Sequence, residues 1–297
     1  MSEQTIIQGD CEKPKISAIA PWFGGKRTLA STIVAEFGPH SAYWEPFCGG
    51  MSILLEKPES SHEHVNDLHG DLINLARVIQ DPTDGAVLYR KLRRVLFSEG
   101  QHAESKERLV SSGCEDRVGR AFDYFVMSWM GRNGVSGTCA FNQTMSRRFT
   151  KNGGHGGQRF NSAVSSIPAW RRRMRRGCIL QADAFKLIES IADQEAVVVY
   201  CDPPYIVKGA KYEHDFESGD HTRLADLLCR FKKTRVVVSY YEHPRLTELY
   251  PGWTKRKLKA TKALVSQGQR GKGSAVEAPE VLLINGPSLV GDAELFS

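Results

Sequence analysis

The sequence predicts an α/β protein in which a mostly parallel sheet is covered by helices on both faces. Short apolar runs rich in β-branched residues recur along the chain, and the segments between them carry the spacing of amphipathic helices. Strands that alternate with helices in this way favour a parallel sheet. A chain of 297 residues is long enough for one large domain, or for one core domain with a smaller insert.

Six runs are predicted to be buried strands because they are short, apolar and bounded by polar or turn-forming residues. These runs are Ala42 to Trp44, His64 to Asn66, Cys178 to Leu180, Ala196 to Tyr200, Arg235 to Tyr240 and Val281 to Ile284. Helices are predicted between them from apolar side chains that share one face. Their apolar sets are Leu29, Ile33 and Phe37; Leu72, Leu75, Ala76 and Ile79; and Leu224, Leu227, Leu228 and Phe231.

One region interrupts the alternation. From about Asp81 to Arg176 the chain shows helical patterns, such as Leu88 to Leu96 and Phe122 to Met130, but no strand. The glycine-rich stretch from Asn152 to Gly157 is predicted to be irregular. We therefore expect three parts: a flexible, polar tail over residues 1–17, a core formed by residues 18–80 and 177–297, and a largely helical insert over residues 81–176.

Charge and cysteine content narrow the class of protein. The net charge of +6 suits a polyanionic partner, and the basic runs at Arg171 to Arg176 and Lys255 to Lys262 can neutralise phosphates. For a single run, a solvated helix face is the simpler interpretation. The seven cysteines are widely spread and form no C-x-x-C pair, so the sequence indicates neither a zinc ribbon nor a disulfide framework. Reduced thiols fit the cytoplasm, and because the sequence has no signal peptide and no apolar run of 18 residues, we expect no membrane span.

The strongest local signal is Asp202-Pro203-Pro204-Tyr205, which follows the apolar run Val197 to Cys201. Ligands of open α/β sheets bind outside the carboxyl ends of strands, and two prolines make this turn stiff. An exocyclic amine on a nucleobase needs two acceptors for its hydrogens and a flat ring to stack on the base. Asp202, the carbonyl of Pro203 and the ring of Tyr205 supply these groups. A plain strand-ending turn with an aspartate cap is the alternative interpretation.

A second signal is the turn Glu45-Pro46-Phe47-Cys48-Gly49-Gly50, which lies between a predicted strand and a short helix over Ser52 to Glu56. Paired glycines let the backbone approach a ligand closely. The next predicted strand ends at Asn66-Asp67, and an acid at the tip of the second strand is well placed to bind ribose hydroxyls.

Upstream, Trp22-Phe23-Gly24-Gly25-Lys26-Arg27 resembles a phosphate loop only superficially, because Ala20 and Arg27 break the pattern G-x-x-x-x-G-K-[ST]. An NTPase is therefore a poor interpretation. Lys26 can meet a carboxylate, and Trp22 can cover a sulfonium or an adenine ring.

Taken in order, these motifs resemble those of the Dam-type (D12 class) DNA adenine-N6 methyltransferases. The set comprises Trp22 to Lys26, Glu45 to Gly50, Val65-Asn66-Asp67, Asp202 to Tyr205 and Glu280 to Asn285, with Arg132 to Gly137 and Phe160-Asn161 in the insert. The resemblance implies a Rossmann-like sheet that uses S-adenosylmethionine as methyl donor, with no metal, and an inserted, mostly helical target-recognition domain. Cys48 and Met51 vary the glycine turn, and Thr144 to Arg148 differ from the usual segment.

The resemblance also implies roles for individual residues. Trp22 and Lys26 would touch S-adenosylmethionine, Asp67 would hold its ribose, and Asp183 would meet its adenine amine. The full cofactor-binding set is Trp22, Lys26, Glu45, Phe47, Gly49, Gly50, Asp67, Asp183 and Asp202. The predicted catalytic residues are Asp202, Pro203, Pro204 and Tyr205, which would receive the target base.

Recognition of DNA is expected from the insert, because arginine and asparagine make bidentate contacts with base edges. The candidates are Arg132, Asn133, Arg147, Arg148, Arg159, Arg172 and Arg173, of which Arg172 and Arg173 are expected to contact phosphates. The function predicted from the sequence is site-specific methylation of N6 on an adenine that has been swung out of duplex DNA.

Three alternatives stay open: methylation of cytosine N4, methylation of adenine in RNA, and a DNA-binding module without catalysis. A zinc nucleobase deaminase is excluded because H-x-E and P-C-x-x-C are absent. The enzyme is expected to be a monomer of a bacterium or a phage, and the sequence leaves open whether it works alone or beside a restriction endonuclease.

Overall fold

A computed structural model describes residues 14–111, 116–131, 136–137, 144–146, 155–206, 215–261, 277–291 and 294–295. These residues form a single eight-stranded sheet with the order β3-β2-β1-β4-β5-β7-β6-β8. The strands are β1 (Ala42–Glu45), β2 (His62–Asn66), β3 (Cys178–Leu180), β4 (Val197–Cys201), β5 (Arg235–Tyr241), β6 (Thr254–Thr261), β7 (Glu277–Ile284) and β8 (Glu294–Leu295). Strands β1 to β5 pair in parallel with each other. Beyond β5, strands β7, β6 and β8 pair antiparallel with their neighbours and form one end of the sheet. This is the mostly parallel, Rossmann-like sheet that the sequence predicts.

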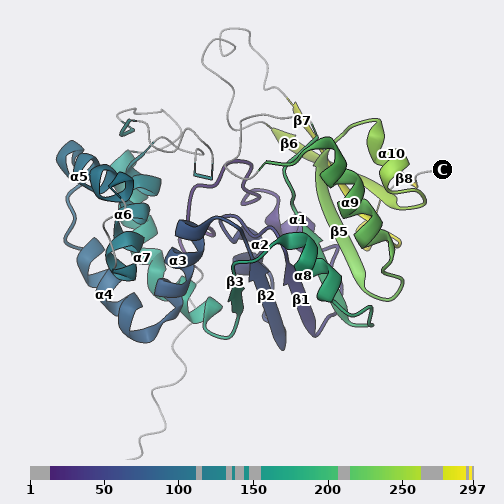
Figure 1. The fold of residues 1–297 in the computed structure, drawn as a ribbon, viewed down its shortest axis with the longest axis horizontal. Coiled ribbons are helices and arrows are strands. Elements are labelled where there is room, and N and C mark those ends of the chain that lie inside the picture. The colour runs from purple at the N-terminus through teal and green to yellow at the C-terminus, as the bar shows by residue number, and fades with distance from the viewer. Residues whose placement is uncertain are drawn as a thin grey trace, which may run out of the picture.

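The helices of the described residues fall into two groups along the chain. Between β2 and β3, the helices and strands of the described residues are all helices: α3 (Gly70–Gln80), α4 (Pro82–Leu92), α5 (Glu99–Val110), α6 (Arg117–Met130) and α7 (Gly156–Met174). The others connect the remaining strands: α1 (Ala30–Val34), α2 (Ser52–Glu56), α8 (Ala184–Ser190), α9 (Ser218–Cys229) and α10 (Arg245–Leu249). Figure 1 shows α4 to α7 gathered beyond the β3 edge of the sheet, while α8 and α9 cross the near face.

Strand β4 is apolar and buried at every position because both faces of the sheet are covered. In β4, Val198 and Tyr200 belong to one buried cluster with the helices from α1 to α7. Val197, Val199 and Cys201 point the other way and belong to a second cluster with α8, α9 and α10. Alternating side chains of one strand therefore fill two cores, which explains the unbroken apolar run before Asp202.

The six predicted strands are all present, with limits that differ by at most four residues. The sequence did not predict β6, because its buried side chains are interrupted by lysine and arginine rather than forming an apolar run. Arg256 of this strand donates to the fully buried Glu36 at 2.9 Å, and Lys255 lies 3.0 Å from Glu242. These basic residues of β6 are thus engaged within the protein.

Two further expectations need correction. The glycine-rich stretch was expected to be irregular, but Gly156 and Gly157 form the first turn of α7. His155 caps this helix by accepting from Gly157 N at 3.1 Å, and Gln158 completes a capping box, so the glycines are held in the first turn. Residues 152–154 lie outside the described residues.

Part of the segment that was expected to be a tail, residues 1–17, is packed into the fold. Residues 1–13 lie outside the described residues, but Ile16 is only 5% exposed. Its carbonyl accepts a hydrogen bond from Trp170 Nε1 at 2.6 Å, and Trp129 Nε1 donates to Ile19 O at 3.1 Å. Two tryptophans of α6 and α7 therefore hold the segment that leads to Trp22. Among the described residues, no helix is both long and apolar enough to cross a membrane.

Candidate active site

A cavity of about 350 Å³ lies where the loops after β1, β2, β3 and β4 meet. This is the carboxyl edge of the parallel strands, where α/β proteins bind their ligands. All of the predicted cofactor-binding residues line it, namely Trp22, Lys26, Glu45, Phe47, Gly49, Gly50, Asp67, Asp183 and Asp202. The structure therefore brings together residues that are up to 180 positions apart in the sequence.

The glycine turn after β1 is shaped by close contact with Trp22. Gly49 has a φ of +42°, and a Cβ at this position would lie 2.7 Å from the Trp22 ring. At Gly50, a Cβ would lie 2.7 Å from the carbonyl oxygen of Ala20. No larger residue fits either position without displacing the loop that carries Trp22, which explains why the chain needs two glycines here.

Asp67 joins the end of β2 to this turn. Its Oδ2 accepts from Gly49 N at 2.9 Å, and its Oδ1 accepts from His69 N at 3.0 Å. The neighbouring Asn66 donates to the carbonyls of Pro46 and Ala182, each at 3.0 Å. These bonds fix the loops after β1, β2 and β3 relative to each other and hold the Asp67 carboxylate at the cavity.

Asp183 lies in the loop after β3 and caps α8, where its Oδ1 accepts from Lys186 N at 2.9 Å. An aromatic wall adjoins it. Phe216 stacks on Phe185 with ring centroids 5.5 Å apart, and meets Phe47 edge to face at 5.7 Å. The guanidinium of Arg223 lies over the Phe185 ring, 4.4 Å from its centroid. No sequence motif points to Phe216 or Arg223, because the segment that contains them shows only the apolar spacing of helix α9.

Lys26 does not point to solvent. Its side chain is 6% exposed, and its ammonium lies 2.8 Å from Asp202 Oδ2 and 3.2 Å from Glu280 Oε1. It also donates to the carbonyl of Gly24 at 2.8 Å. An ammonium has three protons, and these three acceptors match them. In this structure the lysine that was expected to touch the cofactor instead bridges two carboxylates.

Asp202 and Tyr205 are linked through their side chains. The Tyr205 hydroxyl lies 3.1 Å from Asp202 Oδ1 and 2.7 Å from Glu280 Oε1. Burial raises the pKa of Asp202 to about 6, and Glu280 adds to the rise while Lys26 and Tyr205 oppose it. Asp202 and Pro204 line the cavity, whereas Pro203 and Tyr205 lie beside it.

Glu45 is the most deeply buried acid of the cavity wall, with 2% exposure. Its Oε2 accepts from the hydroxyl of Tyr43 at 2.8 Å. Burial raises the pKa of Glu45 to about 8, and the charge of Asp202 adds to this rise. A carboxyl group with such a pKa is protonated near neutral pH unless a cation comes to it.

The DNA-binding candidates are separated by the fold. Arg132, Asn133, Arg147 and Arg148 lie outside the described residues. Arg159, in the first turns of α7, donates to the carbonyl of Trp129 at 3.3 Å. Burial lowers its pKa, and the nearby Arg27 lowers it further.

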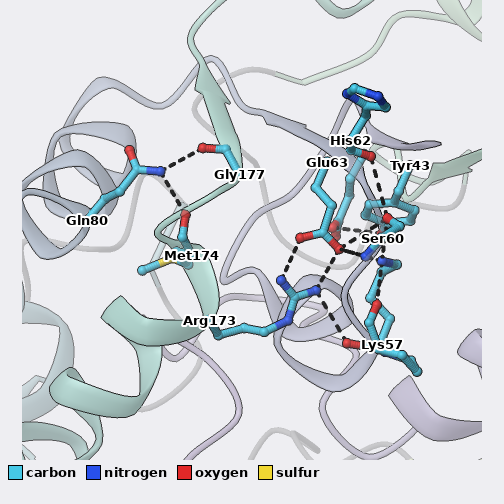
Figure 2. Close-up of polar contacts among 11 residues, drawn as sticks. Tyr43, Lys57, Ser60, His62, Glu63, Gln80, Arg173, Met174 and Gly177 are labelled. Carbon is cyan, nitrogen blue, oxygen red and sulfur yellow. Dashed lines mark hydrogen bonds and ion pairs between the residues drawn. The ribbon is translucent and has the colours of Figure 1, made fainter. Parts of the chain in front are cut away.

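Arg172 and Arg173 lie at the other end of α7, and Figure 2 shows Arg173 reaching Glu63 and Lys57. The guanidinium donates to Glu63 at 2.6 and 2.8 Å, and Lys57 donates to the same carboxylate at 2.6 Å. Glu63 lies near the start of β2, so this cluster is at the amino edge of the sheet, opposite the cavity. The expected phosphate contact of Arg173 is therefore not supported, because its charge is used within the fold. Arg172 is exposed at the same edge.

No group of three or more histidine, cysteine, aspartate or glutamate residues that could hold a metal ion occurs in the described part of the chain. The polar groups of the cavity are instead engaged with backbone amides, with Lys26 or with phenols. Strand-end acids, the glycine turn and residues of the turn Asp202 to Tyr205, called the acceptor turn below, thus meet at one cavity at the carboxyl edge of the parallel strands.

Comparison with known proteins supplies the family. The model of the D12 class N6 adenine-specific DNA methyltransferases matches residues 22–267, and the chain belongs to this family. The retron Ec67 DNA adenine methylase of Escherichia coli is 25% identical over 291 residues, covering 91% of this chain and 92% of that protein. The DNA adenine methylase of Salmonella typhimurium is 25% identical over 303 residues, covering 94% and 99%.

Among solved structures, an rRNA methyltransferase, aviRa from Streptomyces viridochromogenes, aligns with a TM-score of 0.38 and 14% identity, over 86% of this chain and 82% of that one. At that level of similarity, nothing about this chain follows from it. The family expected from the sequence motifs is confirmed by the family match alone.

Proposed function

We propose that this chain transfers a methyl group from S-adenosylmethionine to N6 of an adenine swung out of duplex DNA. One observation carries the proposal. Asp202 and Pro204 of the acceptor turn line the same cavity as the strand-end acids Asp67 and Asp183, in a chain of the adenine-specific DNA methyltransferase family.

The residues of the cavity fit the cofactor. Its volume of about 350 Å³ is in the range of small-molecule sites. We assign Asp67 to the ribose hydroxyls, Asp183 to the exocyclic amine of the cofactor's adenine, and the buried Glu45 to its positively charged methionine part. Phe47 and the glycine turn support it from below. S-adenosylmethionine, when bound, supplies a methyl group made electrophilic by the sulfonium.

The acceptor turn prepares N6 for the transfer. Asp202 and the Pro203 carbonyl accept the two N6 hydrogens, which leaves the nitrogen lone pair directed at the methyl carbon. The ring of Tyr205 stacks on the base, and stacking worth about 1–3 kcal/mol offsets part of the few kcal/mol needed to extrude it. As N6 becomes positively charged, the carboxylate of Asp202 stabilises it. The rate enhancement then comes from positioning and electrostatics rather than from a covalent intermediate.

We assign DNA contact to the insert, with Arg132, Asn133, Arg147, Arg148 and Arg159 as the candidates. Arg159 lies in the first turns of α7, at the end of the helix opposite the Arg173 cluster. We do not propose that Arg172 and Arg173 contact phosphates. The chain is proposed to work as a monomer in the cytoplasm. Light scattering of the free and DNA-bound protein tests whether it is a monomer.

The experiment is mass spectrometry of nucleosides from unmethylated duplex DNA incubated with the protein and S-adenosylmethionine. We expect N6-methyldeoxyadenosine, and less than a tenth of the wild-type rate with Asp202→Ala. N4-methyldeoxycytidine alone would overturn the base assignment and keep the cofactor assignment. Methylated product on RNA but not on DNA would show that the substrate is RNA and not DNA. Binding of DNA without any methylated product would mean a binding module rather than an enzyme.

A further inference from the structure

Glu280 lies on β7 at the edge of the acceptor turn. In the antiparallel ladder it is paired with Tyr241, the last residue of β5, which brings β7 next to the loop after β4. Its side chain is 9% exposed. Sequence motifs included Glu280 only as the first residue of a strand-like run, with no role in the reaction.

The Glu280 carboxylate takes the same two donors as Asp202. Its Oε1 lies 2.7 Å from the Tyr205 hydroxyl and 3.2 Å from Lys26 Nζ, while Asp202 lies 3.1 and 2.8 Å from those donors. A hydroxyl has only one proton, and Tyr205 shares it between the two carboxylates, with the shorter distance to Glu280. Glu280 therefore weakens the hydrogen bond that Tyr205 gives to Asp202 and leaves the facing oxygen of Asp202 more able to accept from another donor.

The charges of the cluster also matter. Two carboxylates and one ammonium leave one net negative charge beside the acceptor turn when Asp202 is ionised. Without Glu280, Lys26 would cancel the charge of Asp202 and leave the turn neutral. A neutral turn offers less stabilisation to a nitrogen that becomes cationic during methyl transfer, and the low dielectric of a buried site makes the difference large.

We propose that Glu280 is a positioning residue for methyl transfer: it draws the Tyr205 hydroxyl and the Lys26 ammonium partly away from Asp202, so that an ionised Asp202 can accept from N6 and the cluster keeps a net negative charge. The inference rests on the proposed function. Its chemistry concerns the transfer step, and the contacts of Glu280 are made to the acceptor turn rather than to Asp67, Asp183 or Phe47 of the cofactor cavity.

The first test is Glu280→Gln, which keeps the shape and removes the charge. We expect the single-turnover rate of methylation at saturating cofactor and DNA to fall roughly 10- to 100-fold. The dissociation constants for S-adenosylmethionine and DNA should change by less than about threefold, since neither ligand's binding groups are altered. Rate and binding are thereby separated.

The pH profile supplies a readout that structural damage would not imitate. The negative charge of Glu280 raises the pKa of Asp202, whereas the hydrogen bond from Tyr205 lowers it. The acid limb of the rate should therefore move to lower pH in Glu280→Gln and to higher pH in Tyr205→Phe. The other groups that face Asp202 are Glu45 of β1, Tyr200 of β4, and Tyr240 and Tyr241 of β5, and all are unchanged in both variants.

Glu242→Gln is the matched control, because Glu242 follows the same β5 end but pairs with Lys255 and Lys257 at the surface. It should keep the wild-type rate and acid limb. Glu280→Asp, which restores the charge, should recover the wild-type acid limb even where the rate stays low. Equal rates for Glu280→Gln and wild type, or acid limbs that move the same way in Glu280→Gln and Tyr205→Phe, would overturn the inference. Failure of the wild type to methylate DNA would instead overturn the proposed function.

Discussion

The ammonium of Lys26 lies 2.8 Å from Asp202 Oδ2, so the loop before α1 supplies the counter-ion for the carboxylate that follows β4. Both side chains are shielded from solvent, with 6% and 21% exposure. A buried carboxylate without a partner would be protonated near neutral pH and would accept hydrogen bonds poorly. The pair is therefore a device that keeps Asp202 ionised while burial opposes ionisation.

Removal of Lys26 should move the acid limb of the reaction upward. Burial raises the pKa of Asp202 to about 6, and Lys26 lowers it from what burial alone would give. In Lys26→Met the pKa rises, so the ionised, active form is lost at a higher pH than in the wild type. We expect the acid limb of the single-turnover rate to lie near pH 6 in the wild type and about one unit or more higher in the variant. An unchanged limb would show that Lys26 does not act on Asp202 in solution.

The glycine turn gives a prediction with a built-in control. In Gly49→Ala, the new Cβ meets the Trp22 ring at 2.7 Å, and the φ of +42° adds backbone strain. Trp22 must move, so the affinity for S-adenosylmethionine should fall about tenfold or more. Gly219→Ala, on α9, has nothing within 4 Å of the new Cβ and should bind as the wild type does. Fluorescence titration with the cofactor measures both, and equal affinities for the two variants would contradict the role of the turn.

The parallel part of the fold was predictable from the sequence because its strands are buried on both faces. Val197 to Cys201 alternates between two cores, and no polar residue interrupts it. The basic strand β6 was not predictable in the same way, since Lys255 and Arg256 are balanced by acids outside the strand, Glu242 after β5 and Glu36 from a distant part of the chain. Periodicity reports burial, but it does not report which charge a lysine will meet.

In the candidate site, too, some features were predictable from the sequence and others were not. Residues within short motifs, such as Asp67 and Asp202, were predictable as cavity residues because they directly follow strands. The pairing of Lys26 with Asp202 and Glu280 was not, because it depends on two loops and strand β7 meeting at one point. The ion pair of Arg173 was not predictable for a related reason: a run of arginines indicates positive charge, but the sequence does not show that Glu63 lies beneath one of them.

Binding of S-adenosylmethionine should release a proton near neutral pH. Burial raises the pKa of Glu45 to about 8, so the free protein carries a protonated Glu45 at pH 7. A cationic ligand beside it favours the carboxylate and drives the proton into the buffer. Calorimetric binding enthalpies at pH 7 should then differ between buffers with different ionisation enthalpies. Glu45→Gln should abolish the difference, and a wild-type enthalpy that is independent of buffer would contradict the assignment of Glu45.

The raised pKa of Glu45 also determines how the stability of the free protein changes with pH. The folded state holds the Glu45 proton more tightly than the unfolded state, in which the ordinary pKa is 4.5. The free protein should therefore lose stability as the pH rises from about 5 toward 8, and Glu45→Gln should be less sensitive over this window. Chemical denaturation at several pH values, without cofactor, measures the effect. A wild-type profile that matches Glu45→Gln would contradict the raised pKa.

Arg173 should contribute to stability and not to DNA binding. Arg173→Ala leaves the 3% exposed Glu63 with Lys57 as its remaining cation, and breaking such a buried pair costs about 3 kcal/mol. Arg172→Ala is the matched control, because an exposed side chain of the same run should change stability by less than about 0.5 kcal/mol. Denaturant unfolding at pH 7 compares the two variants.

The pH dependence of stability and the salt dependence of DNA binding distinguish a stabilising role of Arg173 from a phosphate contact. Burial acts to raise the pKa of Glu63, but the hydrogen bonds from Arg173 and Lys57 outweigh it and lower the pKa below 4.5. The stability that the pair provides is thus fully present above about pH 5, and the difference between wild type and Arg173→Ala should shrink as the pH falls through the lowered pKa. The salt dependence of DNA binding by folded Arg173→Ala should equal that of the wild type. A slope reduced by about one, as loss of one phosphate contact gives, would place Arg173 on the DNA instead.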